Sequence, residues 1–425
     1  MKIKLLVDLG QSEIRGIAKV GTIRTNKRME KLFVFPNSFS KATNPERYSD
    51  KEDYSLADST LLSIQTPDRK YGGQDLSYTV ASGRIRELEF AMSALKFSQR
   101  VPKVHNATSY FAIFSLIEKT LDWVVKEGKF GGSIKDLSQE VVFSLTVLLP
   151  PSQKDLWQDE FKSQLLGTHI IQSYIPKTEL KININSVTFV QEGVSAYFGL
   201  VLRKDSFKQR PLASKLKDAV VLLVDIGAST TDLVVINKGI TIETSRHTIT
   251  VGGNAVLSAL RVHMQKIVGD KISDDTLFSI CQTGLYRNGS QVIDLVNTIN
   301  EFKNQVSDSI NTAIVNYLDS ADFDTYLINR IVVIGGNTME SENKGIKSLG
   351  KLLMEQLKIN LATADVIDIS EEDFSDLDLY HGGDTSQIGR RINLYGASIS
   401  DDVQEVRYLK EEQKKRESEA VKVNL

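Results

Sequence analysis

Residues 7–12 read Val-Asp-Leu-Gly-Gln-Ser and residues 224–232 read Val-Asp-Ile-Gly-Ala-Ser-Thr-Thr-Asp, so the pattern Asp-x-Gly-x-Ser occurs twice. Apolar runs flank both copies, at 3–7 and 14–20 around the first and at 220–224 and 233–236 around the second. Such runs on both sides of a glycine-containing turn are typical of β-hairpins. One copy is expected by chance in roughly 0.2 of chains of this length, but two copies with matching flanks predict a duplicated unit. Below, residues 8–12 are the first turn and residues 225–231 are the second turn.

Both turns have the chemistry of a phosphate site. Gly10 and Gly227 bring backbone N–H groups close to an anion, because glycine has no Cβ. Asp8 and Asp225 would repel bare phosphate, so a carboxylate at the base of each turn implies a hydrated Mg²⁺, held through water, between it and a nucleotide. The predicted phosphate-binding residues are Asp8, Gly10, Gln11, Ser12, Gly227, Ala228, Ser229, Thr230 and Thr231.

Length and composition limit the possible classes of protein. A chain of 425 residues is long enough for two or three domains with large cores. The 52 basic and 54 acidic residues nearly cancel, so no overall field favours direct binding to nucleic acid or to an anionic membrane. Cys281 is the single cysteine, which excludes intrachain disulfides and cysteine metal clusters. With no signal peptide and no apolar run of membrane-spanning length, we expect a cytoplasmic protein without a membrane partner.

The two halves of the chain follow the same order of predicted elements. Each hairpin is followed by a third strand and then by alternating helices and strands. In the first half these are strand 31–35, helix 110–124, strand 141–149, helix 154–166, strand 187–190 and helix 192–202. In the second half they are strand 240–249, a helix from 254, strand 330–334, helix 345–357, strand 364–369 and helix 391–398. Such a duplicated α/β unit is expected to leave a cleft between its halves, where ligands bind at the carboxyl ends of strands.

Composition suggests where domains and insertions begin. The expected domains are 1–217, with a small inserted subdomain at about 36–84, and 218–400, with a largely helical insertion at about 265–324. Residues 371–384 are expected to form an acidic surface loop, and residues 401–425 a charged C-terminal tail that is a frayed, solvent-exposed helix.

The doubled turn and three further motifs resemble those of the actin-like ATPase superfamily, which also includes DnaK-type chaperones and sugar kinases. Residues 190–196 resemble its first connecting motif, 334–337 its adenosine motif and 393–397 its second connecting motif. Within the superfamily the chain looks most like the bacterial plasmid-segregation actins of the ParM (StbA) type, over roughly residues 1–400. The resemblance implies an α/β, duplicated actin/DnaK-like (RNase H-like) fold with two domains around a nucleotide cleft.

The resemblance also implies further site residues. Glu192, directly after a predicted strand, is expected to position the attacking water, with Gln191 as the alternative and Asp225 sharing the role. Arg15 stands where many members carry a phosphate-contacting lysine, and a guanidinium also binds phosphate. The residues expected near ribose and adenine are Glu301, Lys303, Gly335, Gly336 and Asn337. Gly252 and Gly253, before a predicted helix, are expected to present N–H groups to ribose or phosphate. For the two glycine pairs an ordinary turn before a helix remains an alternative.

The implied function is a polymerising ATPase whose filaments move plasmid DNA. Head-to-tail contacts that do not close into a ring give open filaments. The implied partners are further copies of the chain and a DNA-binding adaptor of the ParR type, so that centromere DNA is contacted only indirectly. The implied cofactors are Mg²⁺ and ATP, with GTP left open. A non-polymerising phosphotransferase or phosphatase, a chaperone ATPase and a division or shape-type actin remain alternatives.

Overall fold

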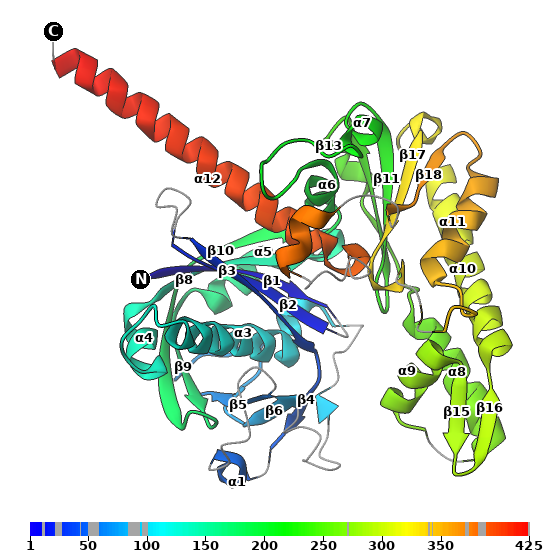
Figure 1. The fold of residues 1–425 in the computed structure, drawn as a ribbon, viewed down its shortest axis with the longest axis horizontal. Helices are drawn as coiled ribbons and strands as arrows, with labels where there is room; N and C mark the ends of the chain where they lie inside the picture. The colour runs from blue at the N-terminus through cyan, green and yellow to red at the C-terminus, as the bar shows by residue number, and fades with distance from the viewer. Residues whose placement is uncertain are drawn as a thin grey trace. The chain divides into compact units, whose positions relative to one another are not determined.

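The computed structural model divides the chain into two compact units, shown in Figure 1. Unit 1 comprises Met1–Glu192 and Ala397–Leu425, and unit 2 comprises Gly193–Gly396. The structure describes residues 1–10, 13–21, 28–42, 44–49, 59–83, 94–95, 101–269, 272–338, 341, 343–369, 374–380 and 388–423.

Unit 1 is built on a ten-stranded mixed sheet in the order β3-β2-β1-β8-β10-β9-β5-β6-β4-β7. Its strands are β1 (Lys2–Leu9), β2 (Glu13–Val20), β3 (Met29–Pro36), β4 (Phe39–Lys41), β5 (Ser59–Ile64), β6 (Val80–Gly83), β7 (Ala94–Leu95), β8 (Val142–Leu149), β9 (Gly167–Ser173) and β10 (Thr178–Gln191). β1 is antiparallel to β2, whereas β1, β8 and β10 are mutually parallel neighbours. In register Asp8 pairs with Leu148, and Leu148 pairs with Val190. The carboxyl ends of these three strands therefore meet at one edge.

The helices of unit 1 are α1 (Glu46–Ser49), η2 (Lys103–His105), α3 (Ala107–Lys126), α4 (Ile134–Glu140), α5 (Pro151–Leu165) and the later turns of α12 (Ile388–Val423). Of these, α3 packs against β1 and β5, and α4 and α5 pack against β10. Asn106 caps α3, because its side-chain oxygen accepts a hydrogen bond from Thr108 N. Phe111, Phe114 and Ile117, which lie on one face of α3 because they are three residues apart, are part of the main core. The helix is buried along nearly its whole length.

The C-terminal helix α12 is tied to unit 1 by a buried ion network. Lys19, 3% exposed, donates hydrogen bonds to Asp402 Oδ1 at 2.6 Å, Asp401 Oδ2 at 3.1 Å and Ser398 O at 3.0 Å. Arg28 also pairs with Asp402, at 2.5 Å. The expected separate tail from residue 401 is thus the continuation of α12, whose last turns extend away from the sheet in Figure 1. Among the described residues, no helix combines the length and the apolar character that a membrane crossing requires.

Unit 2 repeats the plan of unit 1, with the sheet order β13-β12-β11-β17-β18 and with β14 also paired to β12. Its strands are β11 (Val220–Ile226), β12 (Thr231–Asn237), β13 (Ile240–Thr241), β14 (His247–Ile249), β17 (Arg330–Ile334) and β18 (Asp365–Ile367). β11 is antiparallel to β12, whereas β11, β17 and β18 are parallel neighbours. The order and directions match β3-β2-β1-β8-β10, so the predicted duplication of an α/β unit is confirmed.

The remaining elements of unit 2 are mainly helical. They are α6 (Val194–Val201), α7 (Ala213–Leu216), η3 (Glu243–Ser245), α8 (Asn254–Val268), α9 (Asp274–Thr283), β15 (Leu285–Asn288), β16 (Gln291–Asp294), α10 (Val296–Asp319), η4 (Thr325–Leu327), η5 (Gly336–Thr338), α11 (Leu349–Asn360), η7 (Ser375–Tyr380) and the first turns of α12. A small separate core that includes Leu260, Met264, Leu277 and Ile280 lies within the inserted region. The hairpin β15–β16 in this insertion was not predicted.

Two features of the fold differ from the expectation. The units divide after Glu192 rather than after residue 217, because α6 and α7 pack within unit 2, where Tyr197 Oη donates to Leu216 O at 3.3 Å. β10 is a strand of 14 residues where only 187–190 were expected, and its antiparallel partner β9 was missed. Leu180, Ile182 and Ile184 alternate with lysine and asparagine in the first half of β10, which is the pattern of a half-buried strand, so this part of β10 could have been predicted from the sequence.

Replacing Lys19 by methionine should destabilise unit 1. Removing one partner of a buried ion pair typically costs about 3–5 kcal/mol. We expect about 3 kcal/mol here, because Arg28 still pairs with Asp402 and Lys4 still pairs with Asp401. The measurement is urea unfolding followed by tryptophan fluorescence, since Trp123 and Trp157 both lie in unit 1. The matched control is Lys126→Met, which removes a surface pair with Asp122 and should cost less than about 1 kcal/mol. Equal stability of the two variants would contradict the importance of the network.

Candidate functional site

The first turn connects β1 to β2 and is flanked by two buried charged residues, one on each strand. Asp8 and Arg15 lie opposite each other in the β1–β2 pairing, are 6% and 8% exposed, and form an ion pair of 3.1 Å. A Cβ on Gly10 would lie 2.5 Å from Glu13 O and 2.7 Å from Arg15 Nη2. Only glycine therefore fits this turn as it is built. Gln11 and Ser12, also predicted to bind phosphate, lie outside the described residues.

The end of β10 presents the two candidates for positioning water. Glu192 N donates to Leu149 O at 3.0 Å, and Glu192 Oε1 accepts a hydrogen bond from Lys103 Nζ at 2.7 Å. Burial raises the pKa of Glu192, Lys103 lowers it, Asp8 raises it and Arg15 lowers it, so these four groups share one electrostatic environment. The side chain of Gln191 is buried, and its Nε2 has no hydrogen-bond partner in the described part of the chain. An unpaired buried amide is costly and is a donor available to a ligand.

The second turn is bonded to the start of α8. Gly227 N donates to Thr230 O at 2.8 Å, which closes the turn. Gly253 N donates to Gly227 O at 3.1 Å, and Asn254 Nδ2 donates to Ser229 Oγ at 3.0 Å. A Cβ on Gly252 would lie 2.6 Å from Gly227 O, so the glycine pair allows the helix start to reach the turn. The N-terminus of α8 therefore lies against the second turn, and a helix N-terminus is a favourable environment for phosphate.

The predicted adenosine motif joins the same cluster. Asn337 Nδ2 donates to Gly227 O at 2.8 Å and to Ile226 O at 3.3 Å. Gly335 has a φ of 104°, and a Cβ there would lie 2.5 Å from Asp225 Oδ1. The second turn, the start of α8 and residues 335–337 are therefore in contact at the carboxyl ends of β11 and β17.

Asp225 is held by a residue to which no site role had been assigned. Asn393 Nδ2 donates to Asp225 Oδ2 at 2.6 Å, while Asn393 Oδ1 accepts from Gly193 N at 2.7 Å and from Ser195 Oγ at 3.3 Å. This asparagine links both predicted connecting motifs to the carboxylate. The two motifs also touch directly, because a Cβ on Gly396 would overlap the carbonyl oxygen of Ser195.

Three predicted site residues make other bonds. Thr231 is fully buried, and its hydroxyl donates to Val251 O at 2.9 Å. Lys303 Nζ donates to Lys347 O at 2.9 Å and to Ser341 Oγ at 3.2 Å. Glu301 is exposed and accepts a hydrogen bond of 3.4 Å from Gln305. Their roles in nucleotide binding stay predictions.

The carboxylates fit a hydrated cation better than a directly ligated one. Within the described ranges there is no group of three or more His, Cys, Asp or Glu side chains that could hold a metal ion. Mg²⁺ usually keeps several waters and uses one or two carboxylates together with substrate phosphates. Asp8 belongs to unit 1 and Asp225 to unit 2, so a metal served by both stays a prediction.

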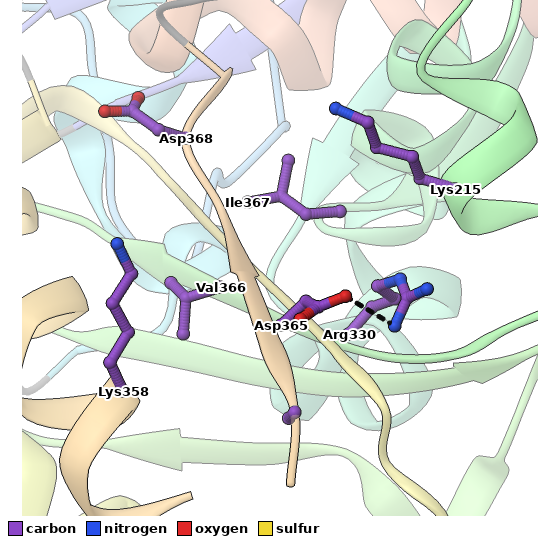
Figure 2. Close-up of a pocket in the computed structure, with 8 residues that line it drawn as sticks. Lys215, Arg330, Lys358, Asp365, Val366, Ile367 and Asp368 are labelled. Carbon is purple, nitrogen blue, oxygen red and sulfur yellow. Dashed lines mark ion pairs between the residues drawn. The ribbon is translucent and has the colours of Figure 1, made fainter. Parts of the chain in front are cut away.

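A pocket of about 530 Å³ lies elsewhere in unit 2. Its lining is Lys215, Arg330, Lys358 and residues 364–368, and Figure 2 shows Lys215 and Lys358 on opposite sides of the strand segment. Arg330 pairs with Asp365 at 3.0 Å. Arg330 begins β17, whereas the Gly335–Asn337 motif follows the other end of that strand. The pocket is therefore separate from the predicted nucleotide residues of unit 2.

Comparison with known proteins supports an actin-like fold. Residues 223–344 match the family model described as "Archaeal actin homologue MreB-like, C-terminal". No significant match was found among curated protein sequences.

Solved structures extend the likeness to nearly the whole chain. The actin-like protein Alp7A is 17% identical, with 97% of this chain and 100% of that chain covered at a TM-score of 0.62. A ParM from a 15-stranded filament of Clostridium botulinum is 18% identical, with 95% and 99% covered at 0.58. The archaeal actin homologue Ta0583 in complex with ADP is 13% identical, with 95% and 99% covered at 0.58. The chain has the actin-like fold, and the expected likeness to ParM-type proteins is confirmed at the level of fold.

Replacing Gly335 by alanine should abolish tight nucleotide binding. The new Cβ would meet Asp225 Oδ1 and Ile226 O, each at 2.5 Å, in a left-handed backbone conformation, so the contact between β11 and the motif must open. We expect at least about a tenfold loss in affinity for a fluorescent ATP analogue, equivalent to about 1.4 kcal/mol. Gly289→Ala is the control, because that glycine also has a positive φ but open space around it. Unchanged affinity in Gly335→Ala would show that the motif does not contribute to binding.

Proposed function

We propose that this chain is an actin-like ATPase that polymerises with bound ATP and moves plasmid DNA. The observation that carries the proposal is the cluster in unit 2, where a glycine turn, a helix start and the Gly335–Asn337 motif meet at the ends of parallel strands. Its counterpart in unit 1 is a second glycine turn with Asp8 and Arg15 at its base. Both belong to a fold shared with ParM and with an ADP-bound archaeal actin homologue.

The proposed chemistry is hydrolysis of ATP to ADP and phosphate. Backbone N–H groups of the two turns bind phosphate oxygens, and Arg15 adds positive charge beside the first turn. Asp8 and Asp225 are the residues that would hold a hydrated Mg²⁺ through its waters, and the ion, when bound, would supply charge neutralisation at the phosphates. Glu192 accepts a hydrogen bond from the attacking water, whose oxygen bonds to the γ-phosphorus while the bond to ADP breaks. Gln191, with its unpaired amide, is the alternative for this role.

The proposed partners follow from the same reading. Further copies of the chain add head to tail, and hydrolysis weakens the contacts between them. A ParR-type adaptor connects the filament to centromere DNA, which agrees with the nearly balanced charge of −2. The proposed location is the cytoplasm, where a single unpaired cysteine stays reduced.

Nucleotide-dependent assembly is the decisive test of polymerisation. Purified full-length protein with Mg²⁺ and ATP should scatter light and pellet, whereas ADP or no nucleotide should leave it in the supernatant. GTP in parallel determines the nucleotide preference. Hydrolysis without assembly over a broad range of protein concentration would rule out the filament and favour a non-polymerising phosphatase or phosphotransferase of the same fold.

Two carboxylate variants separate water positioning from metal binding. Glu192→Ala should slow phosphate release by about 10²-fold or more, with ATP binding and assembly largely retained, because the carboxylate acts on the water. Asp225→Ala should weaken Mg²⁺-dependent binding and turnover together, because it holds the metal shell. The measurements are phosphate release and binding of a fluorescent ATP analogue with and without Mg²⁺. Normal hydrolysis in Glu192→Ala would remove that residue from its role, and normal function in both variants would contradict the proposed site.

A further inference from the structure

We propose that Lys103 is a positioning residue for Glu192, and that its ammonium group holds the carboxylate in the ionised, oriented form that aligns the attacking water. The inference rests on the proposed ATPase function and adds a residue to its machinery. Lys103 lies 89 residues before Glu192 in the sequence, and the fold brings Nζ to 2.7 Å from Oε1.

The lysine is buried and aimed at one acceptor. Lys103 is 6% exposed, and a buried ammonium is unfavourable unless it is paired. Glu192 has a side chain that is 14% exposed, so the pair lies mostly out of water, where a charge-assisted hydrogen bond is stronger than at the surface. This geometry differs from that of an exposed lysine that samples many rotamers.

The backbone on both sides of the pair is anchored. Lys103 N donates to Gln153 Oε1 from α5 at 2.8 Å, and Tyr110 Oη from α3 donates to Val104 O at 2.5 Å. On the other side, Glu192 N donates to Leu149 O, which extends the β8–β10 pairing by one residue. A carboxylate that is fixed at both its backbone and its oxygen can hold a water with little loss of entropy in the reaction.

The charges around Glu192 require a compensating cation. Burial raises its pKa, and the neighbouring carboxylate Asp8 raises it further, whereas Lys103 and Arg15 lower it. Arg15 is already paired with Asp8 at 3.1 Å and with Glu13 at 3.2 Å. Lys103 donates a direct hydrogen bond to Glu192. Without it the pKa of Glu192 should rise, and a protonated carboxyl accepts hydrogen bonds from water poorly.

A purely structural pair makes a different prediction. If Lys103 only fastened η2 to β10, its removal would lower stability and lower activity equally at every pH. If it keeps Glu192 ionised, its removal makes activity depend on pH in a new way, because alkaline solution restores the carboxylate. The pH profile of hydrolysis therefore distinguishes positioning from support.

The experiment measures phosphate release from Mg²⁺ and ATP by the full-length protein between about pH 6 and pH 9.5. In Lys103→Met we expect about a tenfold lower kcat at neutral pH and a KM for ATP within about twofold of the original protein. The acid limb of the pH profile of kcat should move to higher pH by about one unit or more. Activity should therefore partly recover at alkaline pH. Lys103→Arg should keep the original acid limb, because a guanidinium also pairs with a carboxylate.

Further measurements keep the inference separate from the proposed function. Trp157 packs against His105, two residues after Lys103, with ring centroids 4.7 Å apart, so its fluorescence reports whether η2 stays folded in each variant. The role of Lys103 is overturned if the acid limb of the pH profile does not move in folded Lys103→Met, or if it moves in Lys103→Arg. In that case, loss of hydrolysis in Glu192→Gln at every pH would still support the proposed mechanism. If the original protein does not hydrolyse ATP, the proposed function itself is wrong, whereas normal hydrolysis in Glu192→Gln removes Glu192, and Lys103 with it, from the positioning of water.

Discussion

Parallel strand pairing is the constraint on which both candidate sites depend. In each unit the carboxyl ends of neighbouring parallel strands meet at one edge, and the hairpin turn of the first strand lies at that same edge. This geometry brings Asp8 to the end of the sheet where Glu192 lies, and the second turn to the motif that follows β17. Residues far apart in sequence become neighbours because the backbone hydrogen bonds of the sheet leave no other register.

The two sheet edges are held together differently, by close backbone contact in unit 2 and by buried ion pairs in unit 1. In unit 2 the motifs approach so closely that a Cβ on Gly252 or Gly335 would collide with backbone atoms or with Asp225. In unit 1 the edge is instead built from buried ion pairs, Asp8 with Arg15 and Glu192 with Lys103. Buried pairs of this kind contribute little net stability, since desolvation offsets their attraction. At this edge the pairs fix the orientation of the two carboxylates.

Much of the fold could be predicted because its signals are local. The two hairpins, the buried strands β8 and β17 and the helix α3 follow from apolar periodicity and from the repeated turn. The first half of β10 carries the same kind of local signal, an alternation of Leu180, Ile182 and Ile184 with polar residues, but it was not predicted, and its partner β9 was missed with it. The place where the units divide depends on how α6 and α7 pack, which no local pattern reports.

For the candidate site, too, some features could be predicted from the sequence and others only from the tertiary structure. The sequence alone determined the doubled Asp-x-Gly-x-Ser turn and the positions of the glycine pairs, because these depend on residue types a few positions apart, and the resemblance to actin-like ATPases added Glu192 as a prediction. Only the tertiary structure decided that Asn393 holds Asp225, that Asn337 bonds to the second turn and that Lys103 pairs with Glu192. The physical reason is that a hydrogen bond or ion pair requires atoms within about 3 Å, and for residues tens to hundreds of positions apart only the complete packing of sheet and helices produces that proximity.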